Sequence, residues 1–139
     1  MKYALIGCGR VAKHHIWAAR DNDIEIVALC DIDYDKAVAF AQVHGLQNVH
    51  IYKDYKELLK NEGVDFVSIA TVSGTHGEIA LYCAQNKVNF IVEKPLAMSM
   101  AEADAVIDAA QKTGVIAGVC HQNRFSTGRT PERCGRTSR

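Results

Sequence analysis

The sequence predicts an α/β fold: a doubly wound parallel sheet of the Rossmann type. Apolar segments of strand length alternate with amphipathic helical segments along the chain, as in a parallel sheet with helices on both faces. The first strand runs directly into a G-x-G-x-x-A turn. An aspartate then ends the second strand, where dinucleotide-binding sheets place an acidic residue.

The expected elements alternate in order along the chain. In the first half we expect a strand over 3–6, a helix from residue 12, a strand over 24–30, a helix over 34–44, a strand over 49–51 and a short helix capped by Asp54. In the second half we expect a strand over 64–72, a helix from Thr75, a strand over 88–92, a helix from Ser99 to Gly114 and a strand over 115–120. Asp54, Thr75 and Ser99 each stand three residues before a glutamate, so a capping box is predicted at each.

The composition excludes several classes of protein. The chain has 139 residues, 48% of them hydrophobic and 23% charged, and its net charge is zero, so neither nucleic acid nor an anionic membrane is an expected partner. The apolar runs are too short to cross a membrane. The cysteines form no C-x-x-C pair, and we expect Cys30 and Cys120 to pack as small apolar side chains. A cytoplasmic protein without structural disulfides or a metal site is therefore predicted.

The opening turn, Gly7-Cys8-Gly9-Arg10-Val11-Ala12, predicts a pyrophosphate site. Gly7 would allow the tight turn out of the strand, and Gly9 would let the phosphates approach the backbone. Ala12 would keep the next helix close to the sheet, with its N-terminal N–H groups directed at the phosphates. Arg10 and Val11 are further expected cofactor contacts. Glycine-rich turns of this kind also occur for packing reasons alone.

Asp31 is the second predicted cofactor residue, nineteen positions after Ala12. A carboxylate there can accept hydrogen bonds from both ribose hydroxyls of an adenosine, and it repels a 2′-phosphate. Ile32 offers an apolar wall for the adenine, and the next basic residue is Lys36. This pattern favours NAD over NADP. The alternative is that Asp31 or Asp33 only caps the next helix.

Glu93-Lys94-Pro95 ends the strand over 88–92, at the edge where open α/β sheets bind ligands. Such a pair could also be a solvated loop dipeptide. Together with the opening turn, however, the segment V-x-E-K-P-L-A resembles the glucose–fructose oxidoreductase / inositol dehydrogenase family, also written Gfo/Idh/MocA. The resemblance extends from residue 2 to about Phe125.

This resemblance implies an NAD-dependent oxidoreductase that removes a hydride from a secondary alcohol of a sugar, sugar derivative or polyol. It places Glu93 near the nicotinamide ribose and makes Lys94 the catalytic residue, in reach of the nicotinamide and the substrate hydroxyl. It also implies a homo-oligomer whose second domain supplies the substrate pocket. That domain is missing from this sequence, so we expect the cofactor-binding half of an enzyme, inactive alone.

Two further segments resemble family motifs. The loop Thr71-Val72-Ser73-Gly74-Thr75-His76 corresponds to a family pattern T-P-N-x-x-H, with Val72 and Ser73 in place of Pro and Asn. Its Thr71, Val72 and Ser73 are expected cofactor contacts, and His76 either lines the site or faces solvent. In the second segment, Gln122 is an expected contact on the nicotinamide side, and Arg124 could equally form an interdomain salt bridge. By contrast, His14 and His15 are interpreted as structural or surface residues.

Residues 126–139 depart from the pattern of the rest. The segment holds four Arg and one Glu and contains no Val, Ile, Leu, Met or aromatic residue, whereas residues 1–125 carry a net charge of −3. We therefore divide the chain into a Rossmann domain over 1–125 and a basic tail over 126–139. The tail is either a solvated terminus or a segment from another reading frame or from cloning.

Two other functions remain open at this point. One is a non-catalytic domain that binds or senses NAD. The other is a methyltransferase-type Rossmann domain, because S-adenosylmethionine also has a ribose held by an acidic residue after the second strand. The Glu93-Lys94-Pro95 segment and the lack of an acidic residue before Gly7 argue against the methyltransferase.

Overall fold

The computed structural model describes residues 1–121, which form one parallel sheet with helices between its strands. The strands are β1 (Lys2–Ile6), β2 (Glu25–Cys30), β3 (His50–Tyr52), β4 (Phe66–Ile69), β5 (Asn89–Val92) and β6 (Ala117–Val119). The helices are α1 (Ala12–Asp21), α2 (Tyr34–Val43), α3 (Tyr55–Glu62), α4 (His76–Gln85) and α5 (Met100–Thr113), with a 3₁₀ turn, η1 (Ser73–Thr75), before α4.

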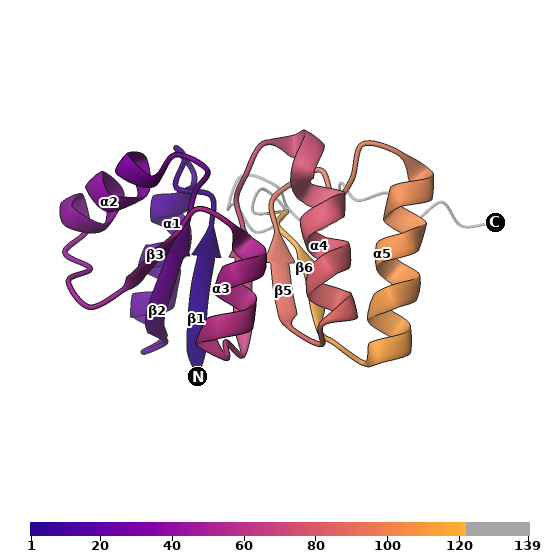
Figure 1. The fold of residues 1–139 in the computed structure, drawn as a ribbon. Coiled ribbons are helices and arrows are strands. Elements are labelled where there is room, and N and C mark those ends of the chain that lie inside the picture. The colour runs from indigo at the N-terminus through magenta and orange to yellow at the C-terminus, as the bar shows by residue number, and fades with distance from the viewer. Residues whose placement is uncertain (122–139) are drawn as a thin grey trace, which may run out of the picture.

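The strand order is β3-β2-β1-β4-β5-β6, and every pairing is parallel (Figure 1). This is the order of a doubly wound dinucleotide-binding sheet, so the predicted fold class is confirmed. The chain leaves β1 toward β2 on one side and later returns to β4 on the other side. The switch point between β1 and β4 is where such sheets bind ligands.

Two hydrophobic cores lie on the two faces of the sheet. In β1, Ala4 and Ile6 pack in the core that includes residues of α3, α4 and α5, whereas Tyr3 and Leu5 pack with α1 and α2. This alternation follows from the period of two along a strand. It explains why the strands read as continuous apolar runs: both of their faces are covered.

Two of the three predicted capping boxes form the side-chain N-cap, although Glu102 accepts from the Met98 backbone N–H and not from that of Ser99. Asp54 and Ser99 accept hydrogen bonds from the backbone N–H groups of Lys56 and Glu102, as a cap requires. Thr75 makes no such bond. Because η1 precedes α4, the Thr75 hydroxyl turns back and donates to the Val72 carbonyl oxygen, 2.9 Å away.

Within residues 1–121, no helix has both the length and the apolar character needed to span a bilayer.

Candidate cofactor site at the carboxyl edge of the sheet

The predicted cofactor residues in the described chain lie at one edge of the sheet. They follow the carboxyl ends of β1, β2, β4 and β5, and these ends share an edge because the strands are parallel (Figure 1). They are Gly7, Gly9, Arg10, Val11, Asp31, Ile32, Thr71, Val72, Ser73, His76, Glu93 and Lys94. The fold therefore brings together four segments that are far apart in the sequence. The prediction for Gln122 lies outside the described residues, as do those for Arg124 and the tail over 126–139.

Gly7 sits at the switch point and is required by the protein itself. Its φ is +98°, a conformation that residues with a side chain rarely adopt. A Cβ at this position would lie 2.5 Å from the carbonyl oxygen of Ala70 and 2.7 Å from the backbone nitrogen of Thr71. The turn after β1 thus passes directly against the backbone that leaves β4, and only glycine allows that approach.

Gly9 has a different environment. A Cβ at Gly9 would meet no protein atom within 4 Å, and its φ is not in the left-handed region. Nothing within the described chain therefore requires a glycine there. The missing side chain leaves open space beside the turn, which is the cradle that a pyrophosphate needs.

The start of α1 also suits an anion. Its N-cap, Val11, makes no side-chain capping bond, and the first turn contains no acidic residue. By contrast, α2, α3 and α5 are capped by the side chains of Asp33, Asp54 and Ser99. The partial positive charge at the N-terminus of α1 is thus left without a local acidic group, next to the open space at Gly9.

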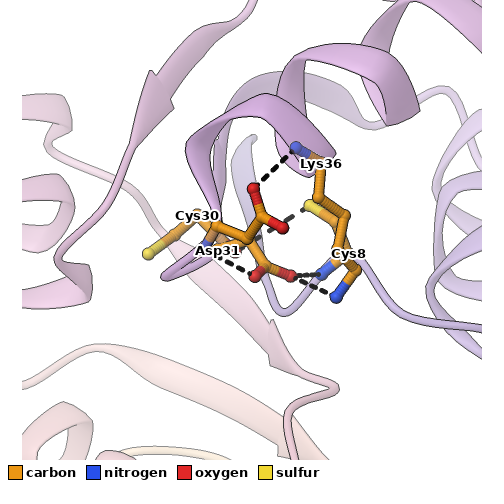
Figure 2. A network of polar contacts seen from close by, with 5 residues as sticks. Cys8, Cys30, Asp31 and Lys36 are labelled. Carbon is orange, nitrogen blue, oxygen red and sulfur yellow. Dashed lines mark hydrogen bonds and ion pairs between the residues drawn. The ribbon is translucent and has the colours of Figure 1, made fainter.

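Asp31 is buried at the end of β2 and accepts three hydrogen bonds. Its Oδ2 accepts from the Cys8 backbone N–H and from Lys36 Nζ, both at 2.9 Å, and its Oδ1 accepts from the Asp33 backbone N–H at 3.1 Å. Figure 2 shows this carboxylate between the opening turn and α2. Burial alone would raise the pKa of Asp31, but the hydrogen bonds from Lys36, Cys8 and Asp33 outweigh it, so the pKa is lowered. Asp31 therefore carries its charge at neutral pH.

Cys8 lies inside the opening turn, and burial, reinforced by the charge of Asp31, raises the pKa of its thiol to about 12. The thiol is therefore neutral at physiological pH. The middle residue of the turn adds no negative charge where phosphates are expected.

The sequence left open whether Asp31 or Asp33 caps the helix after β2, and the contacts around Asp31 distinguish the two. Asp33, not Asp31, caps α2, because its side chain accepts from the Lys36 backbone N–H. Ile32 is 91% exposed, as an apolar wall for an adenine would be before the ligand arrives. Lys36 was noted in the sequence only as the next basic residue, yet its ammonium group is in direct contact with Asp31.

His76 is not a solvent-facing residue, so that alternative is wrong. The side chain is buried, with Nδ1 2.7 Å from the Pro95 carbonyl oxygen and Nε2 3.1 Å from that of Thr71. It therefore bridges the loop after β4 and the loop after β5. It lies beneath the edge, where it joins two loops that are predicted to contact the cofactor.

Glu93 is also buried, whereas its neighbour Lys94 is exposed and is joined to Pro95 by a cis peptide bond. The Glu93 backbone N–H donates to the Ile69 carbonyl at 2.9 Å, so the residue extends the pairing of β5 with β4. Its Oε1 lies 3.0 Å from His15 Nε2. The exposed Lys94 therefore follows directly after a residue whose backbone and side chain are both held by hydrogen-bonding contacts.

His15 lies at the candidate site, although the sequence predicted only a structural or surface role for it. Its side chain is only 10% exposed, because α1 points it at the carboxyl edge of the sheet. A signal was available: His15 stands three residues after Ala12 and four before Ala19, on the buried stripe of the helix. His14, on another face, is exposed, which agrees with the surface alternative of the two that the sequence left open.

The comparison with known families decides the identity of this fold. Residues 1–121 match the model of an oxidoreductase family with an NAD-binding Rossmann fold, Gfo/Idh/MocA. The chain belongs to this family. The family resemblance inferred from the opening turn and from Glu93-Lys94-Pro95 is thereby confirmed.

Individual relatives agree with that assignment. A D-apiose dehydrogenase from Paraburkholderia graminis is 41% identical over 115 residues, which cover 82% of this chain and 30% of the relative. A myo-inositol 2-dehydrogenase from Thermotoga maritima is 30% identical over 126 residues, which cover 90% of this chain and 37% of the relative. The chain spans about a third of the length of these relatives.

Solved structures show the same domain. The WlbA dehydrogenase from Chromobacterium violaceum, determined in complex with NADH and UDP-GlcNAcA, superposes with a TM-score of 0.83 at 28% identity. The match covers 90% of this chain and 36% of the dehydrogenase. The chain thus corresponds to the nucleotide-binding part of a longer oxidoreductase architecture.

Proposed function

We propose that this chain binds NAD along the carboxyl edge of its sheet and is the cofactor-binding half of a dehydrogenase acting on a sugar, sugar derivative or polyol. The observation that carries the proposal is the space at Gly9, next to the uncapped start of α1 and the charged, buried Asp31. In this Gfo/Idh/MocA protein, these features supply room, positive potential and a ribose acceptor in one place.

At the adenosine end, Asp31 would accept hydrogen bonds from the ribose hydroxyls. Its lowered pKa supports this role, because only the carboxylate can accept from both hydroxyls and repel a 2′-phosphate. Lys36 moderates that repulsion, since its ammonium group lies 2.9 Å from Oδ2. We therefore propose a preference for NAD over NADP rather than an absolute choice.

At the nicotinamide end, Lys94 is the proposed catalytic residue. NAD, when bound, accepts the hydride from a carbinol carbon of the substrate. The exposed Lys94 ammonium group would stabilise the negative charge that develops on the oxygen as its proton leaves. Glu93 and Pro95 fix the backbone around it, through the Ile69 carbonyl on one side and His76 on the other.

The proposed substrate class follows from the relatives, whose names include dehydrogenases of D-apiose, myo-inositol and D-glucosides. All of these compounds present secondary alcohols on a polyhydroxylated carbon framework. The individual substrate would be selected by parts of the enzyme beyond this domain.

Isothermal titration calorimetry of the 139-residue chain tests the proposal, with NAD, NADP and S-adenosylmethionine as separate ligands. We expect NAD to bind more tightly than NADP, and S-adenosylmethionine not to bind. Asp31→Ser should weaken NAD binding and reduce the preference for NAD over NADP. Asp33→Ser removes a neighbouring carboxylate but keeps a side chain that can cap α2, so it should leave the ratio unchanged. Absence of NAD binding, or an unchanged ratio in Asp31→Ser, would overturn the assignment.

A further inference from the structure

Three possible metal ligands meet beside the proposed nicotinamide end. The side chains of His15, Glu93 and Cys120 each offer one ligand atom, and these atoms all lie within 4.8 Å of one another. His15 Nε2 and Glu93 Oε1 are 3.0 Å apart. Cys120 is half-buried, and its thiol is hydrogen-bonded to Glu93. It is therefore not the plain apolar side chain expected from the sequence.

We propose that His15, Glu93 and Cys120 form a binding site for one Zn²⁺ ion. One nitrogen, one oxygen and one sulfur donor is a set that Zn²⁺ accepts, whereas Mg²⁺ and Ca²⁺ take oxygen ligands. Three protein ligands leave a fourth tetrahedral position for water or another small ligand.

The separations suit this ion. Bonds of about 2.0–2.3 Å in a tetrahedron place neighbouring ligand atoms about 3.3–3.7 Å apart. The His15–Glu93 distance of 3.0 Å is slightly shorter than this, and every distance in the cluster is at most 4.8 Å. Small side-chain rotations are therefore enough to arrange the three donors around one ion.

The backbone holds each donor in place. Glu93 and Cys120 extend adjacent strands, because their N–H groups donate to the carbonyls of Ile69 and Val92 at 2.9 Å and 2.8 Å. His15 is carried by α1, whose buried side packs against the sheet. The donors come from three segments far apart in sequence, so the lack of a C-x-x-C pair, which led us to expect no metal site, did not bear on this one.

Zinc would also compete with the cofactor, a consequence that rests on the proposed function. Glu93 is an expected contact of the nicotinamide ribose, and a carboxylate bound to Zn²⁺ is withdrawn from that contact. We therefore expect zinc to weaken NAD binding. Zinc binding itself is measured without NAD, so a failure of the site and a failure of the cofactor assignment are distinguishable.

The direct test is a titration of the reduced 139-residue chain with Zn²⁺, followed by competition with a chromophoric chelator. Co²⁺ serves as the spectroscopic probe, because a thiolate ligand gives it a charge-transfer absorption. We expect one equivalent of Zn²⁺ to bind, Mg²⁺ not to bind, and the Co²⁺ spectrum to show thiolate ligation. Cys120→Ser and His15→Asn should each lower the affinity for Zn²⁺ by at least about tenfold.

Two control variants are available in the chain. His50→Asn removes a second His–Glu contact found among residues 1–121, in which Nδ1 of His50 lies 2.7 Å from Glu62 Oε1. Cys134→Ser removes a cysteine outside the described residues. Both should bind Zn²⁺ as the unaltered chain does.

The site is refuted if Zn²⁺ does not bind, or if it binds equally well to Cys120→Ser. The Co²⁺ spectrum decides the matter even if a variant fails to fold, since a spectrum of the Cys134→Ser chain without thiolate ligation also contradicts the site. NAD titrations with and without Zn²⁺ then test the competition: equal NAD affinity in both would overturn it.

Discussion

At the scale of single residues, the two glycines of the opening turn belong to one sequence motif but have different physical causes. Gly7 is imposed by the fold, because its φ is +98° and the Ala70 carbonyl would touch any Cβ. Gly9 is not imposed by any described neighbour, since a Cβ there would meet nothing within 4 Å. The fold itself therefore requires the first glycine, whereas the second is the one we propose for ligand binding.

A pair of alanine variants separates these causes. Gly7→Ala should lower the free energy of unfolding by at least about 2 kcal/mol, because it combines strained backbone with a clash against fixed backbone atoms. Gly9→Ala should change it by no more than about 0.5 kcal/mol but weaken NAD by about tenfold or more, equal to about 1.4 kcal/mol. Urea unfolding and calorimetry measure the two effects. Equal stability losses in the two variants would contradict the distinction.

Asp31 gives the site a pH-dependent stability. The pKa of Asp31 is lowered in the folded chain. Its contribution to the free energy of unfolding is therefore fully present above the unfolded-state pKa of about 3.9, and it is lost as the pH falls through the folded-state pKa. Asp31→Asn should be less stable by about 1–2 kcal/mol at pH 7, a modest figure because Lys36 is half exposed. The deficit should shrink below about pH 4.

Urea unfolding at pH 7 and at about pH 3 measures this change. Asp33→Asn is the matched control, because asparagine caps a helix about as well as aspartate does. A deficit of Asp31→Asn that stays constant between the two pH values would show that the charge of Asp31 is not what stabilises the turn.

At the scale of elements, the site depends on contacts between loops that belong to different βα units. His76, the first residue of α4, bridges the Thr71 and Pro95 carbonyls. The sequence pattern suggested a capping box at this point. The cap does not form, because the Thr75 hydroxyl donates to the Val72 carbonyl at the start of η1, and the buried histidine contacts the carbonyls of both loops.

Replacement of His76 should loosen both loops. His76→Leu keeps a side chain of similar size but removes the imidazole contacts with the part-buried carbonyl oxygens of Pro95 and Thr71, which costs about 1–3 kcal/mol. NAD affinity should fall as well, since Thr71 and Glu93 belong to the loops that His76 connects. His14→Leu, at an exposed position of α1, should be within about 0.5 kcal/mol of the unaltered chain. Urea unfolding and NAD calorimetry of both variants check this, and an unaltered stability of His76→Leu would contradict it.

At the scale of the whole molecule, the fold and the placement of the predicted cofactor residues at one edge of the sheet followed from local patterns. Strand-sized apolar runs, the glycine turn and Asp31 are each contained in a few neighbouring residues, and the rule for parallel sheets then places their ends together. The contacts of Lys36, His15 and Cys120 were not predictable in this way. They depend on how α1 and α2 pack against the sheet and on the place of β6 within it, and no sequence spacing records a meeting of residues 15, 93 and 120.

A final prediction concerns the 139-residue polypeptide, which corresponds to only one part of the longer oxidoreductases. It spans about a third of the length of its relatives, and the family resemblance assigns the substrate pocket to the part it does not contain. Binding of NAD needs only the edge of this sheet, whereas hydride transfer also needs a carbinol carbon held against the nicotinamide. We therefore expect saturable NAD binding without formation of NADH from myo-inositol or D-apiose. NADH absorbance under NAD-saturating conditions measures turnover, and polyol-dependent NADH production lost in Lys94→Ala would show that this domain carries a substrate site of its own.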